Sequence, residues 1–129
     1  MALSDDTIDA SASAFFDGFC AGDFEAVESL LAPGFRAWHN TDDVWQDTAE
    51  HLATLRWLKR EIEGLRYEGV ERTLVPDGFV QTHVLTGTVR GEDLALRACV
   101  IGRFSSDGKL SETREYLDSR ALRPLYSKG

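Results

Sequence analysis

Three residues in one short stretch are of types that can build a binding pocket. Trp38, His39 and Asn40 follow one another in a segment that we predict to be extended. Because side chains alternate along a strand, Trp38 and Asn40 share one face, and His39 points to the other. An aromatic wall beside a neutral amide can hold a water molecule or a substrate oxygen. We therefore predict that Trp38 and Asn40 face a pocket and that His39 has a structural role.

A second candidate for chemistry is the histidine of a later strand. Alternation places Phe79, Gln81, His83 and Leu85 on one face of that strand. Imidazole changes its charge near neutral pH, so a histidine that faces a pocket can act as a general acid or base. We predict this role for His83.

The last strand supplies an acid, on one of two faces. Glu115 shares a face with residues 113 and 117, whereas Tyr116 and Asp118 lie on the opposite face with residue 114. An inward carboxylate among apolar side chains would have a raised pKa, which suits a general acid or base. Alternatively, Glu115 forms a structural ion pair with Arg97, Arg103 or another cation. If the other face is inward, Tyr116 and Asp118 replace Glu115 as candidates.

The residue pattern in the first half of the chain predicts helices. Apolar residues recur at helical spacing after three capping signals, namely Ser4, Asp23 and the capping-box pair Asp47 and Glu50. The expected helices end near Gly22, Pro33-Gly34 and Gly64. Residues 35–40 form the short extended stretch with the triplet, and residues 41–43 are a polar loop. These helices must cover whatever face carries the pocket.

The residue pattern in the second half predicts strands. Residues 65–75, 79–89, 94–104 and 109–118 are strand segments, and Gly-containing turn sequences separate them. This order predicts an antiparallel meander. Three helices on one face of such a sheet make a two-layer α+β domain. With 129 residues and 43% apolar content, residues 1–129 are expected to form a single domain.

The composition of the chain excludes several classes of partner and ligand. The formal charge of -8 leaves no basic surface for nucleic acid or an anionic membrane. The N-terminal residues lack a signal sequence and no segment resembles a membrane span, so we expect a cytoplasmic protein. Cys20 and Cys99 are far apart without a metal-binding or disulfide pattern, and the three histidines lack metal-ligand spacing. We predict neither a metal nor a cofactor.

The order of elements and several short phrases together resemble the SnoaL-like branch of the nuclear transport factor 2 superfamily. The phrases are residues 16–23, Pro33-Gly34-Phe35, residues 107–110 and residues 115–118. The resemblance covers nearly the whole chain and implies a cone-shaped, cystatin-like α+β fold, with three N-terminal helices on a curved antiparallel sheet. The superfamily includes ketosteroid isomerases, polyketide cyclases, dehydratases and limonene epoxide hydrolase, so the fold alone does not select a reaction.

Two members of that superfamily suggest roles for the candidates. In the epoxide-hydrolase pattern, Trp38 and Asn40 fall where an aromatic residue and an Asn hold the attacking water, and Glu115 falls where an Asp activates it. The proton-donating acid of that enzyme is missing, because Leu85 stands two residues after His83. A histidine on this strand is similar to the dehydratase arrangement, in which an imidazole takes a proton and helps a hydroxyl leave. Tyr67 and Tyr116 are the available phenols.

These observations predict a cofactor-free acid–base enzyme for a hydrophobic or aromatic small molecule, with His83, Glu115 and Asn40 as its catalytic groups. Its first expected reaction is elimination, as in a dehydratase or related lyase. Isomerisation, polyketide-type cyclisation and epoxide hydrolysis are alternatives, and a non-catalytic binding or assembly domain is another. The apolar outer side of the sheet, with Val80, Val84 and Val100, predicts a homodimer. The expected substrate-binding residues are Trp38, Phe15, Phe16, Phe19, Leu55, Phe79, Gln81, Leu85 and Cys99.

Overall fold

The structure is a computed structural model, and it describes residues 3–126. Its helical segments are α1 (Asp5–Ala21), α2 (Phe24–Ser29), α3 (Thr48–Glu61), the 3-10 helix η1 (Ser119–Leu122) and α4 (Arg123–Tyr126). Its strands are β1 (Leu31–His39), β2 (Val44–Asp47), β3 (Glu63–Val75), β4 (Gly78–Val89), β5 (Glu92–Phe104) and β6 (Leu110–Leu117). No helix among these residues is long and apolar enough to cross a membrane.

The helices begin where the sequence places capping residues. The side chain of Ser4 accepts a hydrogen bond from the Thr7 backbone at the start of α1, and Asp23 does the same for Ala26 in α2. Asp47 and Glu50 form a reciprocal capping box at the start of α3. Helix α1 ends at Gly22, whose φ of 74° is a left-handed conformation that glycine adopts without strain. These three starts agree with the predictions.

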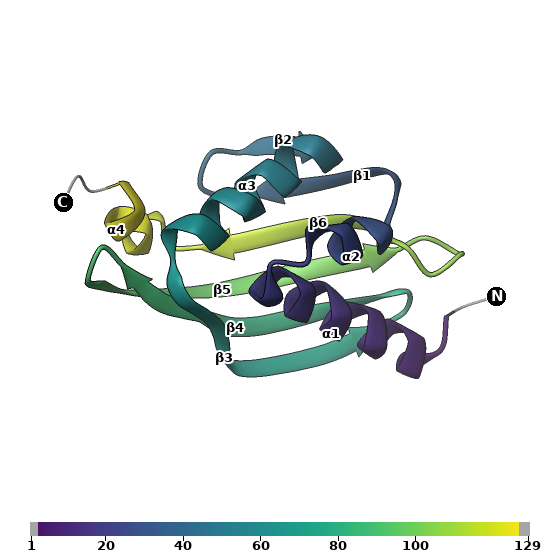
Figure 1. The fold of residues 1–129 in the computed structure, drawn as a ribbon. Coiled ribbons are helices and arrows are strands. Elements are labelled where there is room, and N and C mark those ends of the chain that lie inside the picture. Colours follow the sequence, from purple (N-terminus) through teal and green to yellow (C-terminus); the bar gives the residue numbers. More distant parts are fainter. Residues whose placement is uncertain (1–2, 127–129) are drawn as a thin grey trace.

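The six strands form one curved sheet in the order β2-β1-β6-β5-β4-β3 (Figure 1). Strands β3 to β6 are the predicted antiparallel meander. The sheet is not wholly antiparallel, however, because β1 runs parallel to β6, with His39 opposite Glu115. The chain enters this pairing earlier than predicted: α2 ends at Ser29, before Pro33-Gly34, and β1 starts at Leu31.

Both long helices cover the same face of the sheet (Figure 1). Helix α1 lies over β3 and β4, and α3 lies over β1 and the start of β3. The core between the two layers contains Ile8, Phe19, Val27, Phe35 and Phe79, each 1% exposed or less. The mixed α+β architecture and curved sheet are as predicted. Within residues 3–126, no helix covers the opposite face of the sheet, and we call this face the outer face.

Candidate functional site

A cavity of about 420 Å³ lies between the helices and the inner face of the sheet. Its walls are mostly apolar, and its polar side chains come from β1, the loop after it, β2, α3, β3, β6 and α4. Residues of η1 and α4, Leu122 and Tyr126, line it near the C-terminus. The polar or titratable lining residues are His39, Thr41, Asp42, Gln46, His51, Thr54, Tyr67, Thr113, Glu115 and Tyr126.

Strand β1 presents His39 to this cavity, so the predicted orientation of the triplet is wrong. Trp38 lies on the outer face, where its Nε1 donates to Asp43 Oδ1 at 2.8 Å. The Trp38 ring also packs edge-on against Tyr116, with 5.2 Å between ring centroids. The reason is the phase of the alternation: Phe35 and Ala37 are fully buried, and His39 continues their face.

Asn40 does not reach the cavity either, and its predicted role as an anchor is corrected. Its Nδ2 donates to the Leu117 carbonyl at 3.0 Å, and its Oδ1 accepts from the Leu117 backbone N–H at 2.9 Å. The amide thus copies the hydrogen bonding of a peptide unit and extends the pairing of β1 with β6 by one residue. Both of its polar atoms are occupied by backbone.

Glu115 points inward, which is one of the two orientations that the sequence left open. Its Oε1 lies 3.2 Å from His39 Nε2, so its partner is a histidine and neither Arg97 nor Arg103. The alternative candidates lie elsewhere. Tyr116 is 42% exposed on the outer face, and Asp118 caps η1 by accepting from the Arg120 backbone.

His39 and Glu115 form a partly buried acid–base pair. Burial lowers the pKa of His39, but the hydrogen bond to Glu115 and the charge of that carboxylate act in the opposite direction and prevail, so this pKa is raised. Asp42 adds to the increase. The second ring nitrogen of His39, Nδ1, makes no hydrogen bond within residues 3–126. It remains open for a ligand of the cavity that His39 lines.

A second histidine lies beside this pair. His51, on the first turn of α3, is 5% exposed, and its ring centroid is 5.7 Å from that of His39. Burial, reinforced by the charge of His39, lowers the pKa of His51 to about 4, although Glu115 acts in the opposite direction. His51 is therefore neutral at physiological pH. The sequence signal that could have found it is its spacing of four from Leu55, which lines the same cavity.

Tyr67, on β3, lines the cavity on the side of α1. Burial raises the pKa of its phenol well above the ordinary value of 10.0, and the Glu115 and Cys20 groups add to that effect. Tyr67 thus keeps its proton and presents a hydrogen-bond donor. Sequence reasoning named this phenol without placing it, because β3 has a bulge between Glu68 and Glu71 that obscures its alternation.

His83, the predicted catalyst, is buried behind Tyr67 and does not line the cavity. Its ring packs 4.4 Å from the Tyr67 ring and 5.6 Å from the Phe16 ring, measured between centroids. Its Nδ1 is 2.9 Å from Gln81 Nε2, and Gln81 in turn accepts from Arg72. Strand β5 separates His83 from Glu115, so their backbones are roughly 10 Å apart. The predicted convergence of these two groups is therefore not observed.

Of the nine residues predicted to bind substrate, five line the cavity and four do not. Phe15, Phe16, Phe19, Leu55 and Leu85 all line the cavity. Phe79 instead fills the core at 0% exposure, Gln81 binds His83 and Arg72 away from the cavity, and Cys99 is on the outer face opposite Tyr116. Val100, expected on the outer side, faces inward with Leu96 and Ala98.

The described part of the chain contains no group of three or more His, Cys, Asp or Glu side chains arranged to hold a metal ion. The chemistry that these residues themselves can perform is proton transfer by His39, supported by Glu115. Tyr67 adds a protonated phenol, and His51 a neutral imidazole, to the lining of the same cavity.

Comparisons with known proteins place this architecture in a family. No curated protein matches the sequence. Among solved structures, AclR of Streptomyces galilaeus, a candidate hydroxylase, has a TM-score of 0.82 at 15% identity, covering 97% of this chain and 100% of AclR.

Two further structures are similar. AusH of Aspergillus nidulans has a TM-score of 0.78 at 17% identity, over 90% of this chain and 86% of its own. A candidate SnoaL-like polyketide cyclase of Shewanella denitrificans OS-217 has a TM-score of 0.74 at 14% identity, over 93% and 97%. At these identities the likeness concerns the fold alone. The SnoaL-like domain matches residues 12–113, and with the helix-covered curved sheet and its inner cavity, this shows that the chain belongs to the SnoaL-like family.

Proposed function

We propose that this protein is a cofactor-free acid–base enzyme that moves a proton on a hydrophobic or aromatic small molecule. The observation that carries the proposal is the His39–Glu115 pair, at 3.2 Å, on the wall of an otherwise apolar cavity. The pair takes the place of His83 as the proposed catalytic centre. A pocket of this kind typically binds a small molecule through apolar contacts and fixes its orientation through a few polar groups.

The proposed base is Nδ1 of His39. In the neutral imidazole, Nε2–H donates to Glu115, which leaves the Nδ1 lone pair free to take a proton. The Glu115 carboxylate then stabilises the imidazolium that forms, and it holds the ring in one orientation. Glu115 is thus a positioning and electrostatic partner of the base.

Tyr67 supplies the complementary donor. Proton removal beside a carbonyl places negative charge on the carbonyl oxygen, and a donor that is aimed at this oxygen stabilises the transition state. The Tyr67 phenol stays protonated because its pKa is far above neutral pH. We assign it the role of hydrogen-bond donor to the developing oxyanion.

Elimination of water remains the first proposed reaction. The substrate of this reaction is a β-hydroxy ketone, and His39 removes a proton from the carbon next to its carbonyl group. The electron pair of that C–H bond forms the carbon–carbon double bond, and the bond from carbon to the β-hydroxyl breaks. The proton that His39 accepted is returned to the departing hydroxide, so water leaves and the enzyme is regenerated. The same groups serve an aldol cyclisation, and the structural likeness to a candidate polyketide cyclase favours this as the second possibility.

The test uses a β-hydroxy ketone, 4-hydroxy-4-phenylbutan-2-one, whose dehydration product absorbs in the near ultraviolet. His39→Gln should reduce kcat/KM by about 10²- to 10⁴-fold, the usual contribution of a general base. Cys99→Ala, on the outer face, is the matched control and should leave kcat/KM within a factor of about two. Product analysis separates dehydration from carbon–carbon bond cleavage.

The pH profile tests the role of Glu115. Because the neutral form of His39 is the base, kcat/KM should rise with pH through the raised pKa of His39. Glu115→Gln removes the charge that raises this pKa and leaves the effect of burial, so the inflection should move to lower pH. Full activity in His39→Gln, or an inflection that stays in place in Glu115→Gln, would contradict the proposal.

A further inference from the structure

The hydrogen bonds around His51 determine which of its ring nitrogens carries the proton. The hydroxyl of Thr54 donates its single hydrogen to the Glu50 carbonyl, at 3.2 Å. The same oxygen lies 3.0 Å from Gln46 Nε2 and can only accept there. The amide group of Gln46 therefore presents its NH₂ to Thr54, and its oxygen is left to face the histidine.

That oxygen, Gln46 Oε1, lies 3.3 Å from His51 Nδ1. An amide oxygen only accepts, so Nδ1 of His51 must carry the hydrogen. In a neutral imidazole with a protonated Nδ1, the other nitrogen, Nε2, has a lone pair and no hydrogen. We call this chain from the Glu50 carbonyl through Thr54 and Gln46 to His51 the α3 relay.

Nε2 of His51 has no hydrogen-bond partner within residues 3–126. Across the same residues, no fully buried side-chain nitrogen or oxygen lacks a partner. Nε2 must therefore reach accessible surface, and the surface that His51 lines is the large cavity. The lone pair is presented to whatever the cavity contains.

The groups around His51 keep it an acceptor. Phe35 packs on one side, with 5.6 Å between ring centroids, and Leu55 is the next cavity residue along α3. Burial and the charge of His39 oppose protonation of His51, and they outweigh the opposing effect of Glu115. Neutral His51 cannot become a donor at Nε2 while the α3 relay holds its hydrogen on Nδ1.

We infer that Nε2 of His51 is a fixed hydrogen-bond acceptor that selects ligands with a hydroxyl donor, such as phenols and alcohols, over their methyl ethers. The inference rests on the proposed function in one respect, that this cavity is the substrate site. It requires no turnover. A ligand without a donor would bury the lone pair unpaired, and the cost of that loss reduces affinity by about tenfold.

Binding of 2-naphthol and 2-methoxynaphthalene, measured by isothermal titration calorimetry, tests the selection. Wild-type protein should bind the naphthol about tenfold more tightly than the ether. In His51→Phe, which keeps an aromatic ring but no acceptor, this ratio should fall toward one. Comparing ratios between variants cancels the effect of the additional methyl group. Equal affinities in the wild type, or no binding of either probe, would overturn the inference.

A matched pair at Thr54 tests the α3 relay without altering the histidine. Thr54→Val removes the hydroxyl that orients Gln46, so the preference for naphthol should weaken, whereas Thr54→Ser should keep it. Nitrogen-15 NMR should show the Nδ1-protonated tautomer of His51 in the wild type and in Thr54→Ser. An Nε2-protonated tautomer in the wild type would overturn the inference even if His51→Phe does not fold.

The two proposals can fail separately. Selection of 2-naphthol by a protein that dehydrates no β-hydroxy ketone would support the acceptor and contradict the enzyme. Dehydration by a wild-type protein that binds both probes equally would contradict the acceptor alone.

Discussion

His51 links the cavity to the pH dependence of stability. Its pKa is about 4 in the folded protein and near 6.5 in the unfolded chain, so the unfolded state binds more protons between these values. The contribution of neutral His51 to the unfolding free energy is present above pH 6.5 and is lost as the pH falls toward 4. Over that range, we expect wild-type protein to lose on the order of 3 kcal/mol of unfolding free energy relative to His51→Phe. Urea unfolding at a series of pH values measures the difference.

His39 provides the opposing control. Its folded-state pKa is raised, so its contribution to stability is present below pH 6.5 and is lost as pH rises through the folded pKa. The plot of unfolding free energy against pH should therefore differ in slope between wild type and His39→Gln at higher pH. Between wild type and His51→Phe, the slopes should differ at lower pH. Parallel curves for wild type and His51→Phe between pH 6.5 and 4 would contradict the burial of neutral His51.

At the scale of residues, the alternation on β1 was predicted correctly, but its phase was predicted wrongly. Shifting the alternation by one residue exchanges the two faces of a strand. Here the prediction placed Trp38 and Asn40 toward the cavity, whereas the structure places His39 there. A local signal was available, because Phe35 and Ala37 are apolar and Arg36 is charged. On β4 the phase was right, but whether His83 faces a cavity or a neighbouring ring depends on the position of Tyr67 from another strand.

At the scale of elements, the start of α3 should affect both stability and the site. The Asp47 side chain accepts from the Glu50 backbone N–H, and the Glu50 carboxylate accepts from the Asp47 backbone N–H. Asp47→Ala should cost about 1 kcal/mol of unfolding free energy, because the first turn loses its cap. Asp47→Ser, which retains a capping oxygen, is the control and should stay close to wild type. Chemical denaturation measures both.

The same turn carries Glu50 and His51, and the strand just before it carries Gln46. Fraying of this turn in Asp47→Ala should therefore also weaken the α3 relay, visible as exchange broadening of the His51 ring resonances. If Asp47→Ala and Asp47→Ser have equal stability, the capping box contributes nothing measurable.

Capped helices and Gly-bounded strands were predictable because their signals are local. Strand β2 was missed: it is only four residues long, Val44 and Trp45 are exposed, and it exists through its pairing with β1. The parallel pairing of β1 with β6 joins residues more than 70 positions apart. No local pattern specifies such a contact. The position of Gln46, and with it the α3 relay, depends on these two pairings.

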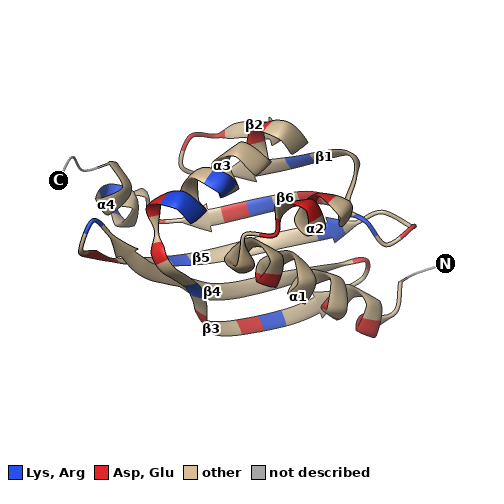
Figure 2. Ribbon diagram, viewed as in Figure 1, with Lys and Arg blue, Asp and Glu red and all other residues tan. Residues whose placement is uncertain are grey.

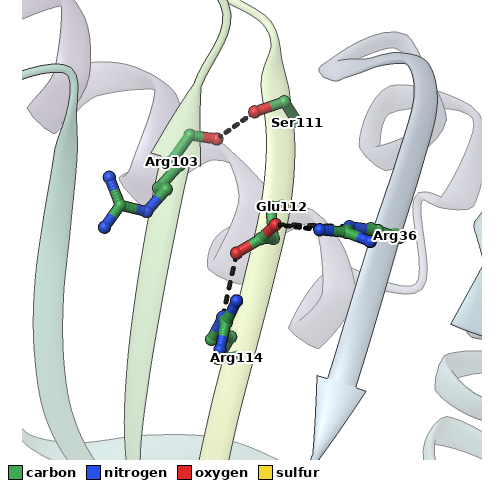
Figure 3. Close-up of polar contacts among 5 residues, drawn as sticks. All are labelled: Arg36, Arg103, Ser111, Glu112 and Arg114. Atoms are coloured by element: carbon green, nitrogen blue, oxygen red, sulfur yellow. Dashed lines mark hydrogen bonds and ion pairs between the residues drawn. The ribbon is translucent and has the colours of Figure 1, made fainter. Parts of the chain in front are cut away.

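At the scale of the whole molecule, the two faces of the sheet have different chemistry. The inner face is covered by α1 and α3, and the outer face carries aromatic and charged side chains. Arg36 and Arg114 flank the Glu112 carboxylate there, both at about 3 Å, as Figure 3 shows. The Arg36 guanidinium also lies 4.1 Å from the centroid of the Trp45 ring.

Basic and acidic residues are interspersed along the strands, and both kinds occur on β3 and on β6 (Figure 2). On the β1 and β6 side, Arg36 and Arg114 both pair with Glu112, and on β3 Arg66 pairs with Glu68 at 2.7 Å. Glu68 and Glu71 lie on β3, opposite Val84 and Thr82 of β4. The exposed Tyr116 and the half-buried Ile101, both on the outer face, favour association of two copies through this face.

We therefore expect a homodimer through the outer face, with a mass in solution twice the 14.4 kDa of the chain. Ile101→Glu should yield monomers, because it would bury an unpaired carboxylate between the two sheets. Ala10→Glu adds the same charge on an exposed position of α1 and should remain dimeric. Size-exclusion chromatography with light scattering distinguishes these outcomes, and circular dichroism verifies that each variant is folded. A monomeric wild type, or a dimer that Ile101→Glu leaves intact, would contradict this interface.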